Sequence, residues 1–372
     1  MFVETLARVE HVFRPLMSFL PDNLAVRMFS AGRTFFAERL AATRPADRSV
    51  PIASTSSSTI WGKTMNSRLW NAAGMFKKGE GYTVAARQGA GAWVAGTTTS
   101  LPRVGNTKAG VTWPVAVYPR TRLASNWLGL PNPGHAAVAA RISKLERHPG
   151  CLIGASVSAD PGMAETEALQ GLVDGMNAYD AAGVDYLELN ESCPNVPGHH
   201  DGPALDDGLI RRLEFVHQHV LAKRRRHLPV VVKFSVDTSV DQLEDLLVLL
   251  VTMGFDGVIL GNTSIAYPDH RQFVHEREMA HYDYFTSTFG GGLSGAPLSP
   301  LSLNIATLAV QIIERLRPAN EFNIIRCGGV SSAADLDESR EHGIQFHQWY
   351  TGYYEAFARY GHDCYRAVVS PR

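Results

Sequence analysis

Short apolar segments alternate with longer amphipathic segments from about Ile60 to the end of the chain. The apolar segments predict strands at 69–73, 92–97, 152–157, 186–190, 230–234, 257–261, 323–327 and 346–350. Helical periodicity lies between them, at 165–182, 205–224, 240–253, 302–316 and 333–342. Strands that alternate with helices indicate a parallel sheet, and eight of them predict an α/β protein with a (β/α)₈ TIM barrel.

A different pattern precedes the barrel. Apolar residues recur at three- and four-residue steps on either side of a break at Pro21-Asp22-Asn23, first in Phe2, Leu6, Val9, Phe13, Leu16 and Leu20, then in Leu24, Met28, Phe29, Phe35, Phe36 and Leu40. This predicts a small N-terminal extension of two amphipathic helices, which can cap the barrel, dimerise or rest in a lipid interface. We divide the chain into an amphipathic helical region at 1–48, a linker and lead-in at 49–68, and the barrel at 69–372.

Composition narrows the choice of partners and compartment. The formal net charge of −1 and the pI near 6.9 give no reason to expect a nucleic-acid partner. The four cysteines lack a CxxC spacing, which argues against a zinc site and fits a reducing, cytoplasmic compartment. Three of them, Cys151, Cys327 and Cys364, are expected to be packed thiols. We expect no metal: His199-His200-Asp201 form a polar cluster, but no third ligand is placed there by spacing.

The fourth cysteine lies in a polar loop that carries candidate chemistry. Cys193 follows the strand predicted at 186–190 and lies between Asn190 and Asn195. A thiol at the end of a strand can act as a nucleophile or as a proton acceptor. The flanking amides can bind imide or carboxylate groups of a substrate. This loop therefore predicts an active site.

Other strand ends suggest a phosphorylated cofactor. The turns Gly328-Gly329 and Tyr350-Thr351 follow the seventh and eighth strands, where barrels bind phosphate with backbone N–H groups. Lys233 lies inside an apolar strand and needs an anionic partner, either a neighbouring carboxylate or a flavin that becomes anionic on reduction. Together these features favour FMN. The long excursions at 101–150 and 263–292 also follow strands, and they are candidates for the walls and lids of the site.

Three motifs carry a family resemblance. They are Asn-Glu-Ser-Cys-Pro-Asn-Val-Pro-Gly at 190–198, Asn-Trp-Leu-Gly-Leu-Pro-Asn at 126–132 and Gly-Gly-Leu-Ser-Gly at 291–295. Over roughly 69–369 the chain resembles the dihydroorotate dehydrogenases, FMN-dependent barrel enzymes of pyrimidine biosynthesis. The resemblance implies oxidation of dihydroorotate to orotate, with Cys193 as the general base that takes the C5 proton while a hydride passes from C6 to the flavin N5.

The resemblance also implies roles for individual residues. Positions that match the substrate-binding set are Asn126, Asn190, Asn195, Asn262 and Ser264. Positions that match the set around FMN are Ala73, Gly74, Lys77, Thr97, Ser156, Lys233, Ser294, Gly295, Gly328, Gly329, Tyr350 and Thr351.

Features of two classes of the family occur together. A cysteine base, the Gly-Leu-Pro-Asn sequence and Ser156 resemble the soluble class, whereas Lys77 and the helical extension resemble the membrane-associated class that reduces quinone. Quinone and fumarate both stay open as electron acceptors, as do a homodimer and a peripheral contact of residues 1–48 with the inner membrane surface. The alternatives to this function are an FMN-dependent reductase similar to dihydrouridine synthase and a non-catalytic flavin-binding barrel.

Overall fold

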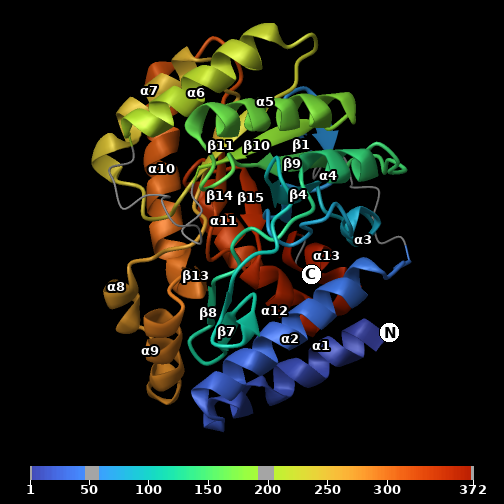
Figure 1. Cartoon of the computed structure of the whole chain (residues 1–372), viewed down its shortest axis with the longest axis vertical. Coiled ribbons are helices and arrows are strands. Elements are labelled where there is room, and N and C mark those ends of the chain that lie inside the picture. Colours follow the sequence, from blue (N-terminus) through green and yellow to red (C-terminus); the bar gives the residue numbers. More distant parts are fainter. Residues whose placement is uncertain (1, 47–57, 192–204, 370–372) are drawn as a thin grey trace.

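The computed structural model describes residues 2–46, 58–191 and 205–369, and its centre is a sheet of eight parallel strands (Figure 1). The strands are β3 (Leu69–Asn71), β4 (Ala92–Thr98), β9 (Leu152–Val157), β10 (Tyr186–Asn190), β11 (Val230–Phe234), β12 (Gly257–Leu260), β14 (Asn323–Cys327) and β15 (Phe346–Trp349). They lie in the order β3-β15-β14-β12-β11-β10-β9-β4. The two end strands meet where Asn71 Nδ2 donates to the Val94 carbonyl at 2.9 Å. The predicted TIM barrel is confirmed.

Helices surround the sheet, and those predicted from periodicity are present with shifted ends. They include α3 (Tyr82–Gln88), α4 (His135–Ile142), α5 (Glu165–Ala181), α6 (Asp207–His219), α7 (Leu243–Thr252), α10 (Ser299–Leu316), α11 (Ala333–Glu341), α12 (Thr351–Tyr360) and α13 (Cys364–Val369). The segment predicted at 205–224 ends its α-helix at His219 and continues as a 3₁₀ turn, Leu221–Lys223. Helix α10 begins three residues early, because Pro300 is well suited to a first helical turn.

The strands are buried on both faces, as parallel strands in a barrel must be. Val230, Val231 and Val232 of β11 are each fully buried although their side chains alternate between the two faces. The outer face packs on the helices. The inner face also carries polar side chains, some of which take part in the candidate active site.

The two long excursions build a small antiparallel sheet beside the barrel. Residues 101–150 contain β5 (Thr107–Lys108), β6 (Val111–Thr112), β7 (Val115–Tyr118) and β8 (Leu123–Asn126), and the second excursion contains α8 (Tyr267–Arg271) and α9 (Met279–Thr288) before β13 (Gly292–Gly295). The sheet has the order β13-β8-β7, with Gly295 paired to Leu123 and Gly292 to Asn126. It fixes the start and the end of β8 against the chain segment that follows α9.

The N-terminal helices pack against the small sheet and against helices α9 and α12 (Figure 1). Helix α1 (Phe2–Phe13) contacts α12, and α2 (Asp22–Ala41) contacts β7 and α9. The buried side chains of the two helices include Ala7, Ala25, Val26 and Leu40, and Phe36 packs edge-on against Phe357 of α12. The apolar stripe predicted from periodicity is instead largely exposed, at Phe2, Val9, Phe13, Leu16, Leu24, Met28 and Phe35. The extension therefore covers part of the barrel and still presents an apolar surface.

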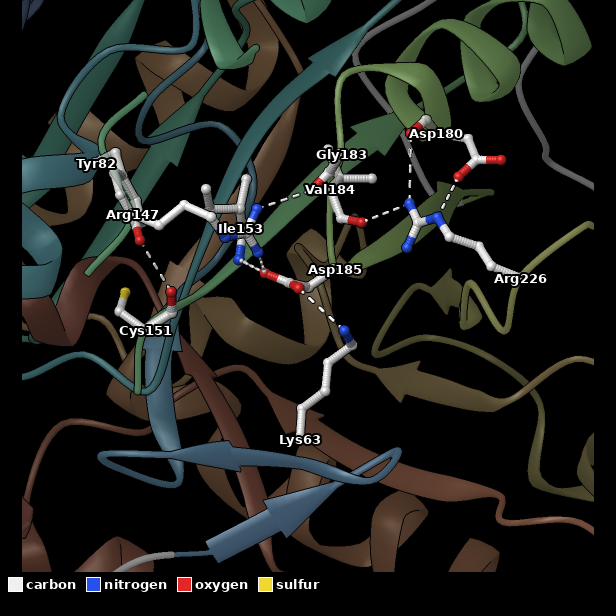
Figure 2. A network of polar contacts seen from close by, with 10 residues as sticks. All are labelled: Lys63, Tyr82, Arg147, Cys151, Ile153, Asp180, Gly183, Val184, Asp185 and Arg226. Carbon is white, nitrogen blue, oxygen red and sulfur yellow. Dashed lines mark hydrogen bonds and ion pairs between the residues drawn. The ribbon is translucent and has the colours of Figure 1, made fainter. Parts of the chain in front are cut away.

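A polar network lies at the N-terminal ends of the barrel strands (Figure 2). The hairpin of β1 (Ser58–Ile60) and β2 (Lys63–Met65) brings the Lys63 ammonium 3.1 Å from Asp185 Oδ1. The other oxygen of Asp185 accepts from the Ile153 N–H at 2.8 Å and pairs with Arg147. Arg147 also donates to the Gly183 carbonyl at 2.8 Å. These contacts tie the starts of β9 and β10 to the hairpin below them.

One helical stretch among the described residues, Ala296–Leu316, is long and apolar enough for a membrane span. It consists largely of α10, which packs against β14 and α7 in the helical layer of the barrel.

Candidate active site

A cavity of about 1080 Å³, part of it open to solvent, lies at the C-terminal ends of the barrel strands. Most of the residues assigned above to substrate and cofactor line it together: Ala73, Gly74, Lys77, Thr97, Asn126, Asn190, Lys233, Asn262, Ser294, Gly295, Gly328, Gly329, Tyr350 and Thr351. The first excursion contributes Leu128 and Leu130 to the wall, and the second contributes Thr263. Active sites of TIM barrels are built at this end of the strands.

Two assigned residues lie just outside the lining. The Ser156 hydroxyl is buried 2.9 Å from Thr97 Oγ1, which also accepts from Asn190 Nδ2 at 3.1 Å. Ser156 therefore supports two residues of the wall. The Ser264 hydroxyl donates to Asp237 Oδ1 at 2.6 Å and lies 2.8 Å from His270 Nε2.

Cys193 and Asn195 lie outside the described residues, as does the His199-His200 pair. The described chain stops at Glu191, directly after Asn190 on the cavity wall. Glu191 is anchored there by Arg212, whose Nη2 lies 2.8 Å from Glu191 Oε2. Residue 193 is two positions beyond this last described residue.

The floor of the cavity holds a buried cation. The Lys233 ammonium donates to Gln348 Oε1 at 2.9 Å and lies 3.8 Å from Glu188 Oε1. Gln348 Nε2 in turn donates to Glu188 Oε2 at 2.8 Å, whereas Glu188 Oε1 has no hydrogen-bond partner. An ammonium carries three N–H donors, and Gln348 takes one of them. Lys233 is thus paired with a carboxylate and can also donate to a ligand above it.

The opposite side of the cavity has turns suited to phosphate. At Gly329 (φ +78°) an added Cβ would lie 2.4 Å from the Ser299 amide nitrogen, so only glycine fits this close approach. The Ser302 hydroxyl holds the neighbouring Gly328 carbonyl at 2.6 Å. Thr351 opens helix α12. The Tyr353 N–H of its first turn donates to the Tyr350 carbonyl at 3.1 Å, and the remaining N–H groups and the dipole of a helix N-terminus favour an anion.

Sequence reasoning missed several lining residues, among them Arg122, Ser331, Gln348, Trp349 and Glu355. Glu188 on the floor was also missed. A signal for Glu188 was present, because it lies two residues before Asn190 in the same strand and so faces the same side. Arg122 lies in a long excursion, where residue spacing does not predict which side chains reach the site.

The other cysteines are buried, as expected of packed thiols. Cys327 also lines the cavity. Burial raises the pKa of the Cys327 thiol, and this effect outweighs that of the nearby Lys233 ammonium. Cys327 is therefore a poor candidate for a reactive thiolate.

Comparison with known proteins gives the same assignment as the motifs. The family model for dihydroorotate dehydrogenase matches residues 55–361. The chain belongs to the dihydroorotate dehydrogenase family. Members of this family are flavin-dependent oxidoreductases.

Individual relatives cover most of this chain. A "dihydroorotate dehydrogenase (quinone)" of Parvibaculum lavamentivorans is 32% identical over 91% of this chain and 87% of the relative. One of Bordetella pertussis is 30% identical over 84% of each chain. A solved structure of DHODH from Eimeria tenella with ferulenol has a TM-score of 0.72 at 21% identity, over 91% of this chain and 89% of that one. The last comparison supports the fold.

Proposed function

We propose that this protein oxidises dihydroorotate to orotate with FMN as its cofactor. The cavity carries the proposal, because it combines a buried, partly unsatisfied cation on its floor with glycine turns for a phosphate on its wall. The family match favours this reaction over that of dihydrouridine synthase. The proposal gives residues 69–372 the role of an FMN-binding catalytic barrel.

FMN, when bound, would supply the acceptor for the hydride that leaves C6 of dihydroorotate. Lys233 would be the cation that stabilises negative charge on the flavin ring. The turns at Gly328-Gly329 and at Thr351 would hold the phosphate. Asn126, Asn190 and Asn262, which line the cavity, present amides for the ring and carboxylate of the substrate, and Asn195 and Ser264 complete the proposed set.

Cys193 is the proposed general base. It follows Asn190, which lines the cavity, by three residues. A thiolate there accepts the C5 proton, and the usual thiol pKa of about 8.5 makes the reaction faster toward alkaline pH. Under anaerobic conditions, Cys193→Ala is expected to slow reduction of the flavin by dihydroorotate about 10²- to 10⁴-fold. Cys364→Ala, at a buried cysteine that does not line the cavity, is the matched control. Equal rates in the wild type and Cys193→Ala would remove Cys193 from the mechanism.

We propose quinone as the electron acceptor in preference to fumarate. Arg33 of α2 donates to the Tyr350 hydroxyl at 2.9 Å and to the Gly74 carbonyl at 3.4 Å, and both partners line the cavity. The N-terminal helices thus touch the flavin site directly, and the relatives above are named for quinone. Turnover measured with a soluble quinone should exceed turnover with fumarate. Faster turnover with fumarate would identify fumarate as the electron acceptor.

Residues 1–48 are a proposed peripheral membrane contact of a protein whose barrel lies in the cytoplasm. Exposed apolar side chains lie on α1, on α2 and on the 3₁₀ helix Arg14–Phe19 between them. Phe13 and Leu16 are exposed by more than half. The double change Phe13→Gln and Leu16→Gln should lower binding to phospholipid vesicles several-fold, because apolar area buried in the interface drives such binding. Leu301→Gln, at an exposed position on α10, is the control. An equal loss of vesicle binding in the double variant and in Leu301→Gln would contradict the proposed membrane contact.

A further inference from the structure

Arg122 lies at the cavity, and neither the motifs nor the comparisons assign it a role. It directly precedes β8, and its carbonyl accepts from the Ala296 N–H at 2.9 Å. An added Cβ at Gly295 (φ +126°) would lie 2.3 Å from that carbonyl oxygen, so the two backbones approach closely. The backbone of Arg122 is therefore held against Gly295 of the cavity wall.

The side chain of Arg122 points across the wall toward the glycine turn after β14. Its Nη2 donates to the Ser331 hydroxyl at 2.9 Å, and Ser331 lies two residues beyond Gly329. Both residues line the cavity. None of the ion pairs between described residues includes Arg122. A guanidinium has five N–H donors, so most of those on Arg122 remain for a ligand.

The charged side chains near Arg122 have partners of their own. Asp335 accepts from the Ser331 and Ser332 N–H groups, at 2.9 and 2.8 Å, and so caps α11. Glu355, the acidic side chain of the cavity lining, pairs with Arg14. Lys233 is engaged with Glu188 and Gln348 on the floor.

A second guanidinium lies behind the same turn. Arg326 is fully buried and donates to the hydroxyls of Ser302 at 3.0 Å and Ser339 at 2.6 Å, and to the Ser299 carbonyl at 2.9 Å. These partners are neutral, and the Ser302 hydroxyl also holds the Gly328 carbonyl. The turn therefore has a cation on its buried side and another on its exposed side.

We propose that Arg122 binds the phosphate of the flavin cofactor and closes the phosphate site from the solvent side. The inference rests on the proposed function, since FMN supplies the phosphate. Guanidinium groups bind phosphate oxygens through paired, charge-assisted hydrogen bonds. Arg122 thus adds a charged contact to the backbone N–H groups of the turns.

The test compares two flavins that differ only in the phosphate. The full-length protein, freed of flavin, is titrated with FMN and with riboflavin, in the wild type and in Arg122→Gln. We expect Arg122→Gln to weaken FMN binding about tenfold, the effect of one charge-assisted hydrogen bond near solvent, and to leave riboflavin binding unchanged. Arg122→Lys should restore part of the loss. FMN binding by the wild type should also be more sensitive to salt than that by Arg122→Gln.

Arg120→Gln is the matched control, because Arg120 is exposed two residues away and does not line the cavity. Unchanged FMN affinity in Arg122→Gln would overturn the inference and leave the proposed function intact. Equal weakening of FMN and riboflavin would overturn it too, because Arg122 would then only hold the wall in place. A wild-type protein that binds neither flavin would overturn the proposed function and the inference together.

Discussion

The two ends of the barrel hold their buried carboxylates differently. At the N-terminal end, both oxygens of Asp185 are bonded, to Lys63 and to Ile153 and Arg147 (Figure 2). Deeper toward the C-terminal end, Glu188 is fully buried and one of its oxygens has no hydrogen-bond partner. A buried polar group left unsatisfied costs stability, so it persists where it has another use. We therefore expect the first arrangement to serve the fold and the second, where Glu188 pairs with Lys233 at 3.8 Å, to serve the cavity.

Replacing Lys233 with methionine should have the largest effect. The rate of flavin reduction by dihydroorotate should fall about 10²- to 10³-fold, because the cation that stabilises charge on the flavin is lost. Stability should fall by about 3 kcal/mol, because Glu188 would become an unpaired buried charge. Stopped-flow reduction and urea unfolding measure the two effects.

The double variant Lys233→Met with Glu188→Gln separates the two roles. Removing the unpaired carboxylate should restore most of the stability and none of the rate. If the rate returned together with the stability, the pair would be structural, like the network around Asp185.

At the other end of the barrel, Asp185→Ala should reduce the free energy of unfolding by about 2–3 kcal/mol, since the buried Ile153 N–H loses its acceptor. The rate of flavin reduction per folded molecule should not change. Lys63→Met should cost less than about 1 kcal/mol, because the Lys63 side chain is partly exposed. A large loss of rate in Asp185→Ala would contradict the division between the two ends.

His347 provides a smaller test, on the outer side of the barrel. Its two ring nitrogens are buried without partners, and burial together with the nearby Arg326 lowers its pKa to about 3. The unfolded chain binds this proton below about pH 6.5, so the stability that His347 supports is present above that pH and is lost progressively as the pH falls toward 3.

At about pH 5 the loss due to His347 should be about 2 kcal/mol relative to neutral pH. Urea unfolding of His347→Leu should therefore depend less steeply on pH than that of the wild type. His342→Gln, at an exposed position, is the control and should keep the wild-type slope. A slope unchanged in His347→Leu would show that other groups govern the acid sensitivity.

The sequence predicts the barrel well because its strands are dense in buried β-branched residues, such as the three valines of β11. Residues at strand ends, such as Asn190 and Gly328, could be placed because a parallel barrel brings all strand ends together. The excursions were predicted to form walls of the site, but the individual side chains that they bring to it could not be predicted. Arg122 reaches Ser331 only through the pairing of β8 with β13, a contact between distant segments.

Periodicity failed in an instructive way at the N-terminus. It identified the helices α1 and α2 but only part of the face that packs on the barrel. Phe36 and Leu40 of the predicted stripe do pack there, beside small residues such as Ala7 that periodicity did not single out, whereas Phe13 stays exposed. A hydrophobic stripe predicts burial against some partner, and it does not identify the protein's own core as that partner.

The most direct test of the central claim is anaerobic addition of dihydroorotate to the purified protein, followed through the visible absorbance of the flavin. The account predicts a yellow protein whose flavin is bleached by one equivalent of dihydroorotate with formation of one equivalent of orotate. A protein that binds FMN but is not bleached, while its fold and cavity are intact, would contradict the assignment of the cavity to this reaction.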